Sequence, residues 1–359
     1  MNWKNKITTS LAIDYPIVQA PMFGVGTPAM AAAASNIGGL GSLPLGDLAG
    51  DQCIALLRET KKLTDKPFAA NIFVNDIPPL TEKLLHQYQE SRSFIEELAH
   101  KNGLDLSLPD LEEFQLTDYR DQVDALISEG CSAISFIFGN LDKESIEKCK
   151  EHGVLLIGTC TSVQEALELE RSGIDLICVQ GYEAGGHRGS FHQENIPAIG
   201  GLSLLPQVYD AVSVPLIYAG GIYNAKTVHA TKLLGAAGFQ IGSMLLCAKE
   251  SSLLDFEKQA LKNAGEDQIV LTKSFSGRYA RGLSNTFIKA LDHSKYVLPY
   301  PYQNKLTGAL RKLAKKKQNI NFLSVWAGSS LSSFSDAGTA EILLNLIKEV
   351  EQTAEKQNF

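Results

Sequence analysis

Residues 215–242, PLIYAGGIYNAKTVHATKLLGAAGFQIG, contain two short apolar runs with a helix-like segment between them. The runs Pro215–Ala219 and Gly238–Gly242 have the length of strands. They lack the polar–apolar alternation of a half-exposed strand, which is typical of strands buried on both faces. Asn224 is of a residue type that starts helices, and Gly235 is of one that ends them. The stretch therefore predicts a strand–helix–strand unit.

The same alternation runs through most of the chain before residue 250. Six more apolar runs of strand length precede the two above: Ile17–Met22, Leu40–Leu43, Phe68–Val74, Ala133–Phe138, Val154–Thr159 and Leu176–Gln180. Eight strands alternating with helices predict an α/β fold, a closed (β/α)8 TIM barrel. An open, doubly wound sheet is the alternative.

Two segments do not fit the strand–helix repeat. Residues 77–115 are polar and helical in pattern, and they predict a helical insertion after the third strand. Residues 270–335 are rich in aromatic residues and glycine, and we expect them to fold back over the barrel mouth. The predicted division is residues 1–270, a barrel with its insertion, and residues 271–359, a C-terminal extension that caps the mouth. Within it, the basic run Lys312–Lys317 predicts a solvated helix face.

Composition excludes several classes of function. The chain is 44% apolar, and its 33 basic and 40 acidic residues give a net charge of −7, which does not favour binding to nucleic acid or anionic membranes. No stretch resembles a membrane span or a signal-peptide core. The six cysteines show no CxxC pair and sit in apolar runs, which predicts reduced, buried thiols in a cytoplasmic protein. No cluster has metal-ligand spacing, so we expect no metal.

In a barrel of this kind, the site lies at the carboxyl ends of the strands. Gly220-Gly221 and Gly242-Ser243 follow the seventh and eighth strands, where phosphates usually bind, and glycine lets the backbone approach an anion closely. These residues predict a bound phosphate, which could belong to a substrate or to a flavin. The alternative is that the glycines only turn the chain.

Polar side chains at other strand ends are candidates for the site. Gln180 and Asn71 end apolar strands, and a buried amide needs a hydrogen-bond partner. A flavin ring edge would supply one, and so would the barrel mouth itself. His187 stands beside Arg188 in a glycine-rich loop at a strand end. It is the leading catalytic candidate because imidazole is suited to proton transfer near neutral pH. A structural histidine is the alternative.

Several short motifs together resemble one enzyme family. They are Gln19-Ala20-Pro21-Met22, Asn71 within Ala-Asn-Ile-Phe-Val, Ser135-Phe136-Ile137-Phe138-Gly139, Gly185-Gly186-His187-Arg188-Gly189, Ala219-Gly220-Gly221-Ile222 and Ala280-Arg281-Gly282. Over nearly its whole length, the chain resembles the nitronate monooxygenases, once called 2-nitropropane dioxygenases, which are FMN-dependent TIM barrels.

The resemblance implies a set of cofactor contacts. The residues implied to contact FMN are Met22, Asn71, Gln180, Gly185, Gly186, Gly220, Gly221, Gln240, Ile241, Gly242 and Ser243, with Met22 near the isoalloxazine. His187 would face the flavin N5 as the catalytic residue. The tail from Pro299 to Thr307 resembles the nitronate-oxidising branch, and it suggests Tyr300, Tyr302 and Lys305 as substrate contacts.

The implied activity is FMN-dependent oxidation of alkyl nitronates by O2 to a carbonyl compound and nitrite. Propionate 3-nitronate is the family's usual substrate, and the role is detoxification of nitro compounds. With a neutral nitroalkane, His187 would act as the base. Two positions depart from the family pattern: Ile137 replaces a frequent histidine, and Ser329 replaces a frequent glutamine. The first puts substrate placement in question.

Three other functions fit the same residues. An NAD(P)H-dependent flavin reductase acting on quinones or enoyl thioesters shares the Gly-Gly-His loop. A flavin-binding protein without turnover and a phosphosugar-binding barrel without flavin are the other two. The oligomeric state stays open, with a homodimer as the candidate assembly.

Overall fold

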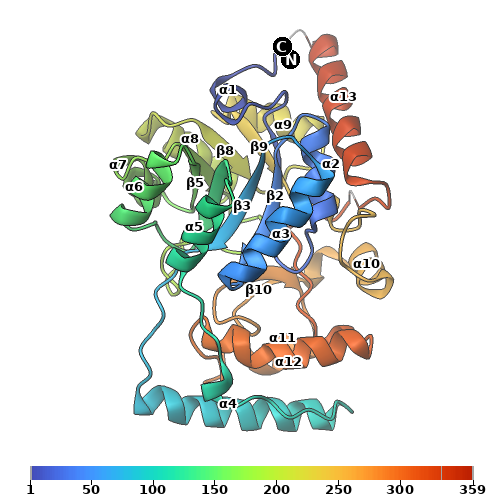
Figure 1. The fold of residues 1–359 in the computed structure, drawn as a ribbon. Helices are drawn as coiled ribbons and strands as arrows, with labels where there is room; N and C mark the ends of the chain where they lie inside the picture. The colour runs from blue at the N-terminus through green and yellow to red at the C-terminus, as the bar shows by residue number, and fades with distance from the viewer. Residues whose placement is uncertain (1, 333, 358–359) are drawn as a thin grey trace.

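Eight parallel strands form the centre of the protein in a computed structural model, which describes residues 2–332 and 334–357. They are β1 (Ile17–Gln19), β2 (Gly41–Gly46), β3 (Phe68–Phe73), β4 (Ala133–Ile137), β5 (Leu155–Cys160), β6 (Leu176–Gln180), β8 (Leu216–Ala219) and β9 (Gly238–Ile241). They pair in the order β1-β9-β8-β6-β5-β4-β3-β2, and a parallel bridge between Val18 and Leu40 closes the ring. The predicted (β/α)8 barrel and its eight strands are confirmed (Figure 1).

Helices cover the outside of this ring. They are α2 (Pro28–Asn36), α3 (Gly50–Leu63), α5 (Tyr119–Ser128), α6 (Lys143–Glu151), α7 (Val163–Arg171), α8 (Gly201–Ala211), α9 (Ala225–Leu233) and α13 (Thr339–Gln357). Short polar side chains start several of them, as the sequence indicates. Asn224 accepts from the Thr227 N–H at 3.0 Å, and Asp142 accepts from the Ser145 N–H at 2.8 Å. The helix α1 (Lys6–Leu11) buries Ile7 and Leu11 against residues at the amino ends of the strands.

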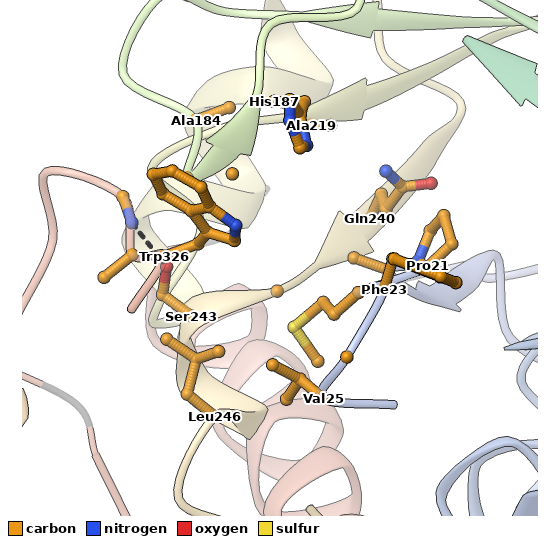
Figure 2. A pocket seen from close by; sticks show the side chains of 18 of the residues that line it. Pro21, Phe23, Val25, Ala184, His187, Ala219, Gln240, Ser243, Leu246 and Trp326 are labelled. Carbon is orange, nitrogen blue, oxygen red and sulfur yellow. Dashed lines mark hydrogen bonds between the residues drawn. The ribbon is translucent and has the colours of Figure 1, made fainter. Parts of the chain in front are cut away.

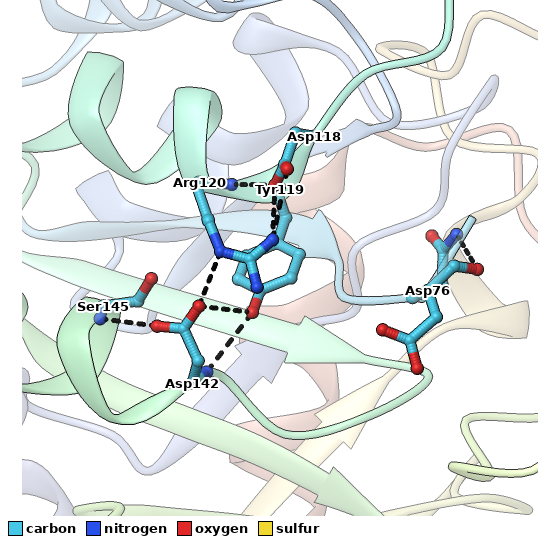
Figure 3. A network of polar contacts seen from close by, with 7 residues as sticks. Asp76, Asp118, Tyr119, Arg120, Asp142 and Ser145 are labelled. Carbon is cyan, nitrogen blue, oxygen red and sulfur yellow. Dashed lines mark hydrogen bonds and ion pairs between the residues drawn. The ribbon is translucent and has the colours of Figure 1, made fainter.

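A polar network on the barrel wall joins α5 to the start of α6 (Figure 3). The Asp142 carboxylate accepts from the Tyr119 hydroxyl at 3.0 Å and from Arg120 Nε at 2.6 Å. Because Asp142 also caps α6, one carboxylate satisfies the helix start and holds its neighbour. The network fixes the connection after β4, and Tyr119, Arg120 and Asp142 do not line the cavity at the carboxyl ends of the strands.

The helical insertion packs on the C-terminal part of the chain. Its helix α4 (Glu82–Lys101) lies beyond α11 (Thr286–Leu291) and α12 (Tyr302–Lys316), on the side away from the barrel (Figure 1). Phe94 stacks on Tyr296 with the ring centroids 4.2 Å apart, and Lys295 forms an ion pair of 2.8 Å with Glu90. The predicted insertion after β3 is therefore confirmed.

The segment after β9 covers the carboxyl ends of the strands. It contains η2 (Ser243–Leu245), α10 (Asp255–Lys262), η3 (Glu266–Gln268), β10 (Ile269–Thr272), β11 (Ala280–Leu283), α11, α12 and η4 (Ile320–Phe322). β11 pairs antiparallel with β10 and with β7 (Gly186–His187), a short strand in the loop after β6. This three-stranded sheet attaches the covering segment to the barrel mouth.

The last helix departs from the expected cap over residues 271–359. α13 packs against α9 and α2 on the barrel wall, where it completes the ring of helices. The reason is that the eighth strand of a (β/α)8 barrel needs a helix over its outer face. The buried Leu343, Leu346 and Val350 provide the apolar surface. The division of the chain at residue 270 stays a prediction.

All six cysteines are buried and free, as their apolar surroundings predict. Burial raises the pKa of Cys178 to about 12, so its thiol stays protonated at neutral pH. Among the described residues, no helix has the length and hydropathy needed to cross a membrane.

Candidate functional site

A cavity of about 420 Å³ lies at the carboxyl ends of the strands, beneath the covering segment. Its size is within the range usual for small-molecule sites. The predicted residues that line it are Met22, Asn71, Gln180, Gly185, Gly186, His187, Gly220, Gly221, Gln240, Gly242 and Ser243. Figure 2 shows His187, Gln240, Ser243 and Trp326 arranged around it. Residues far apart in the sequence thus meet in one cavity, at the end of the barrel where the site was expected.

Two glycine-containing turns lie side by side on its wall. Ala219 pairs with Gln240 in the sheet, so the residues that follow β8 and β9 are neighbours in space. Gly220 and Gly221 have φ angles of 135° and 64°, which a residue with a side chain rarely adopts. Backbone with no side chain here can approach an anion closely.

The Ser243 hydroxyl adds a donor to these turns. Its oxygen accepts from the Gly328 N–H at 2.9 Å (Figure 2), so its own proton stays available. The glycine turns and this hydroxyl form a donor set that fits a phosphate, and the cavity beside it provides space for a flavin ring.

The loop after β6 holds His187 through the covering segment. His187 pairs with Ala280 and Gly186 with Arg281, between β7 and β11. Gly185 lies against the same segment, because a Cβ atom there would stand 2.4 Å from the Gly328 nitrogen. Glycine at 185 is therefore required by close backbone packing.

His187 lies among aromatic rings. Its ring centroid is 6.1 Å from that of Phe73, 5.5 Å from that of Phe138 and 5.6 Å from that of Trp326. Its Nε2 atom is 2.8 Å from the Ser276 hydroxyl. Burial lowers the pKa of His187 to about 3, and the nearby cations Arg278 and Arg311 lower it further. The imidazole is therefore neutral at physiological pH.

Both predicted amides find partners within the protein. The Asn71 amide donates to the Ser135 hydroxyl at 2.9 Å. The Gln180 amide donates to the His187 carbonyl at 2.9 Å and accepts from the Gly189 N–H at 2.8 Å. Gln180 thus holds the ends of the residue 187–189 turn. Both amides are thus satisfied by partners in the barrel mouth, which was the alternative to a flavin ring edge. Both side chains nevertheless line the cavity.

Four predicted contacts do not line the cavity. Ile241 is fully buried in β9. Tyr300 is buried against Phe73 and Phe138, with ring centroids 6.3 and 5.5 Å away. The other two are held elsewhere: Tyr302 donates to the Pro78 carbonyl at 2.7 Å, and Lys305 is 2.9 Å from Asp47. Of the three proposed substrate contacts, only Tyr300 contacts an aromatic ring that lines the cavity.

Sequence reasoning missed several lining residues. Trp326, Asn304 and Arg311 line the cavity and were not predicted as site residues. Lys312, Lys316 and Lys317 are exposed, as predicted for the basic run, and Lys312 and Lys315 also line the cavity. Helical spacing could have identified Asn304, Arg311 and Lys315, because these positions fall on one face of a helix.

The model of the family described as nitronate monooxygenase matches residues 4–349. The chain belongs to this family. A probable nitronate monooxygenase of Staphylococcus saprophyticus is 35% identical over 357 residues, covering 98% of this chain and 99% of that protein. One of Staphylococcus aureus is 36% identical over 354 residues, covering 97% and 98%.

Solved structures show the same likeness. A nitroalkane oxidase from Streptomyces ansochromogenes superimposes with a TM-score of 0.88 at 31% identity, covering 98% of this chain and 100% of that chain. FabK from Thermotoga maritima superimposes with a TM-score of 0.76 at 25% identity, covering 99% and 98%.

As a member of this family, the protein is an oxidoreductase that acts on a small molecule. Membership also supports nitronate oxidation and a flavin cofactor. Within the described residues, no three His, Cys, Asp or Glu side chains gather in a way that could hold a metal ion.

Proposed function

We propose that the chain oxidises alkyl nitronates, propionate 3-nitronate among them, with O2 and bound FMN, releasing a carbonyl compound and nitrite. The observation that supports it is the placement of a neutral His187 and a glycine-lined anion cradle in one cavity of a nitronate monooxygenase family member. Detoxification of nitro compounds is the role we infer. A cytoplasmic location and a homodimer stay predictions.

The cradle after β8 and β9 accounts for the choice of FMN. Gly221 and Ser243 would hold the single phosphate of FMN, with the Ser243 proton donated to it. Met22, Gln180 and His187 would lie along the ring. FMN, when bound, supplies the electron transfer between the nitronate and oxygen.

His187 would orient the nitronate rather than deprotonate it. The Ser276 hydroxyl lies 3.0 Å from the Arg278 carbonyl and donates its one proton there, so the His187 Nε2–H donates to Ser276. The Nδ1 atom then carries the lone pair. Because the low pKa of His187 makes it a weak base, a substrate that arrives already ionised suits this site better than a neutral nitroalkane.

Surrounding charge favours the same substrate class. The positive charges of Arg278 and Arg311 both lower the pKa of His187. No carboxylate among the described residues lies within 4.0 Å of either guanidinium. Glu165 and Asp76 act on Arg278, and Asp47 acts on Arg311, without contacting them. Positive charge that no carboxylate contacts attracts anions to the cavity beside it. A nitronate is an anion, and a nitroalkane is not.

The second candidate is an NAD(P)H-dependent flavin reductase that acts on quinones or enoyl thioesters. The likeness to FabK at 25% identity favours it, but that protein is less similar to this chain than the nitroalkane oxidase is. The two candidates differ in their reductant. The reductase oxidises NAD(P)H, and the nitronate oxidase does not need it.

Oxygen uptake tests the proposal. Purified protein with propionate 3-nitronate should consume O2 and form nitrite, and NADPH should not change the rate. Rapid bleaching of bound flavin by NADPH, with no nitronate-dependent oxygen uptake, would establish the reductase instead. His187→Asn separates the orienting role from the base role. If His187 orients the nitronate, the variant should lose turnover of a preformed nitronate. Loss confined to a neutral nitroalkane would assign the base role instead, and unchanged activity on both would remove His187 from its role.

A further inference from the structure

One face of α12 is turned to the cavity. Asn304, Arg311 and Lys315 are seven and then four residues apart, a spacing that puts side chains on the same side of a helix, and all three line the cavity. Tyr302 and Lys305 lie on other sides of α12 and contact Pro78 and Asp47. The helix therefore presents a basic stripe to the cavity.

Only part of this positive charge is neutralised. Lys315 is 3.0 Å from the buried Glu257 carboxylate, and Asp47 is 2.9 Å from Lys305. Both nearby carboxylates are thus already paired. In the part of the chain that the structure describes, no carboxylate oxygen lies within 4.0 Å of the Arg311 guanidinium. Arg311 is therefore a cation at the cavity wall that no carboxylate contacts, although Asp47 acts on it from farther away.

The Arg311 guanidinium is nevertheless held in place. Its Nη2 atom donates to the Asn304 carbonyl at 2.7 Å and to the Asn304 side-chain oxygen at 2.8 Å, and its Nε donates to the Thr307 carbonyl at 3.4 Å. Nη1 has no hydrogen-bond partner among the described residues. These contacts fix the side chain and leave donors for a ligand.

A half-buried cation that no carboxylate contacts is unfavourable, and an anion in the cavity would offset that cost. Burial lowers the pKa of Arg311 to about 10, which still leaves it charged at neutral pH. Arg311 also lies near enough to His187 to lower the pKa of that ring. The phosphate cradle proposed above consists of residues after β8 and β9, so it does not account for Arg311.

We propose that Arg311 binds a carboxylate of the substrate, so that the site selects nitronates carrying a second anionic group over simple alkyl nitronates. The inference rests on the proposed function. Nη1 keeps its N–H donors free, and a charge-assisted hydrogen bond from them to a carboxylate is stronger than one between neutral groups. Arg311 is thus a specificity-determining residue, and His187 contacts the reacting end.

The test compares two substrates in holoenzyme variants. Oxygen uptake with propionate 3-nitronate and with propyl nitronate gives kcat/KM for wild type, Arg311→Met and Arg311→Lys. Lys316→Met removes an exposed charge from the same helix and is the matched control. We expect Arg311→Met to lose roughly 10- to 100-fold on the carboxylated substrate, mainly through KM, and less than about threefold on propyl nitronate. Arg311→Lys should fall between wild type and Arg311→Met, and Lys316→Met should match wild type.

Other results overturn the inference and can be separated from failure of the proposed function. Equal losses on both substrates would assign Arg311 to the nitronate group or to the fold. Loss of flavin absorbance in Arg311→Met would assign it to the cofactor, and no loss on either substrate would leave it without a role in binding. A wild-type enzyme that oxidises neither nitronate would contradict the proposed function itself.

Discussion

The Nε2 atom of His187 lies 2.8 Å from the Ser276 hydroxyl, which joins a loop of the barrel to the segment that covers it. The contact connects residues 89 positions apart in the chain. Ser276 is buried, and its hydroxyl also donates to the Arg278 carbonyl at 3.0 Å. The ring that we place beside the substrate is therefore oriented by a residue outside the eight strands.

Removing this partner should reduce activity without removing the cofactor. Ser276→Ala frees the His187 ring to rotate, and we expect kcat/KM for nitronate oxidation to fall by roughly tenfold, as when a partner that orients an active-site group is lost. Steady-state oxygen uptake measures the effect, with flavin bound per chain as the control. Unchanged kcat/KM would show that Ser276 does not position the ring.

The low pKa of His187 predicts how stability depends on pH. An exposed histidine in the unfolded chain binds a proton below about pH 6.5, whereas the folded protein resists protonation down to a pKa of about 3. The neutral His187 therefore makes its full contribution to the free energy of unfolding above about pH 6.5. That contribution is lost as pH falls from there toward 3.

His187→Gln removes that titration. Between about pH 6.5 and 4, the wild type should lose free energy of unfolding more steeply than the variant, by up to about 1.4 kcal/mol per pH unit. Urea denaturation at about pH 7, 6 and 5 measures both slopes. Parallel curves would mean that His187 titrates normally in the folded protein.

Gly185 is expected to tolerate no side chain. An alanine Cβ would stand 2.4 Å from the Gly328 nitrogen and 2.5 Å from the Ala327 carbonyl carbon, both of which are backbone atoms. Gly185→Ala should lower stability by about 1–3 kcal/mol and weaken flavin retention, because the cover must move away from the barrel. Gly308→Ala is the control, since nothing lies within 4 Å of the added atom. Thermal denaturation and flavin content measure both, and equal behaviour would contradict the close contact.

Tyr300 and Tyr302 offer a matched pair of hydroxyl deletions. The buried Tyr300 hydroxyl has no hydrogen-bond partner among the described residues, whereas the Tyr302 hydroxyl donates to the Pro78 carbonyl at 2.7 Å. Tyr300→Phe should therefore raise the free energy of unfolding by about 1 kcal/mol, and Tyr302→Phe should lower it by a similar amount. Chemical denaturation distinguishes the two signs. Destabilisation by both changes would show that Tyr300 has a polar partner.

The barrel could be predicted from the sequence because strands buried on both faces are marked by continuous apolar runs. The run Leu176–Gln180 and its counterparts needed no knowledge of distant contacts. The strand-end rule also brought Gly221, Ser243 and His187 to one cavity before their contacts were known.

The partners of these residues could not be predicted in the same way. Ser276, Trp326 and Arg311 belong to a covering segment with no repeating pattern, so their approach to His187 depends on tertiary packing. Tyr302 and Lys305 were placed at the substrate because they stand in a recognisable motif. The rotation of α12 instead turns Asn304 and Arg311 toward the cavity.

The cofactor tests the central claim most directly. The absorption spectrum of the purified protein and chromatography of the compound released by heat determine whether a flavin is bound and which one. We predict a yellow protein that releases FMN, and a Ser243→Ala variant that retains less of it. A colourless protein that cannot be loaded with FMN would contradict the account, as would one that releases only FAD.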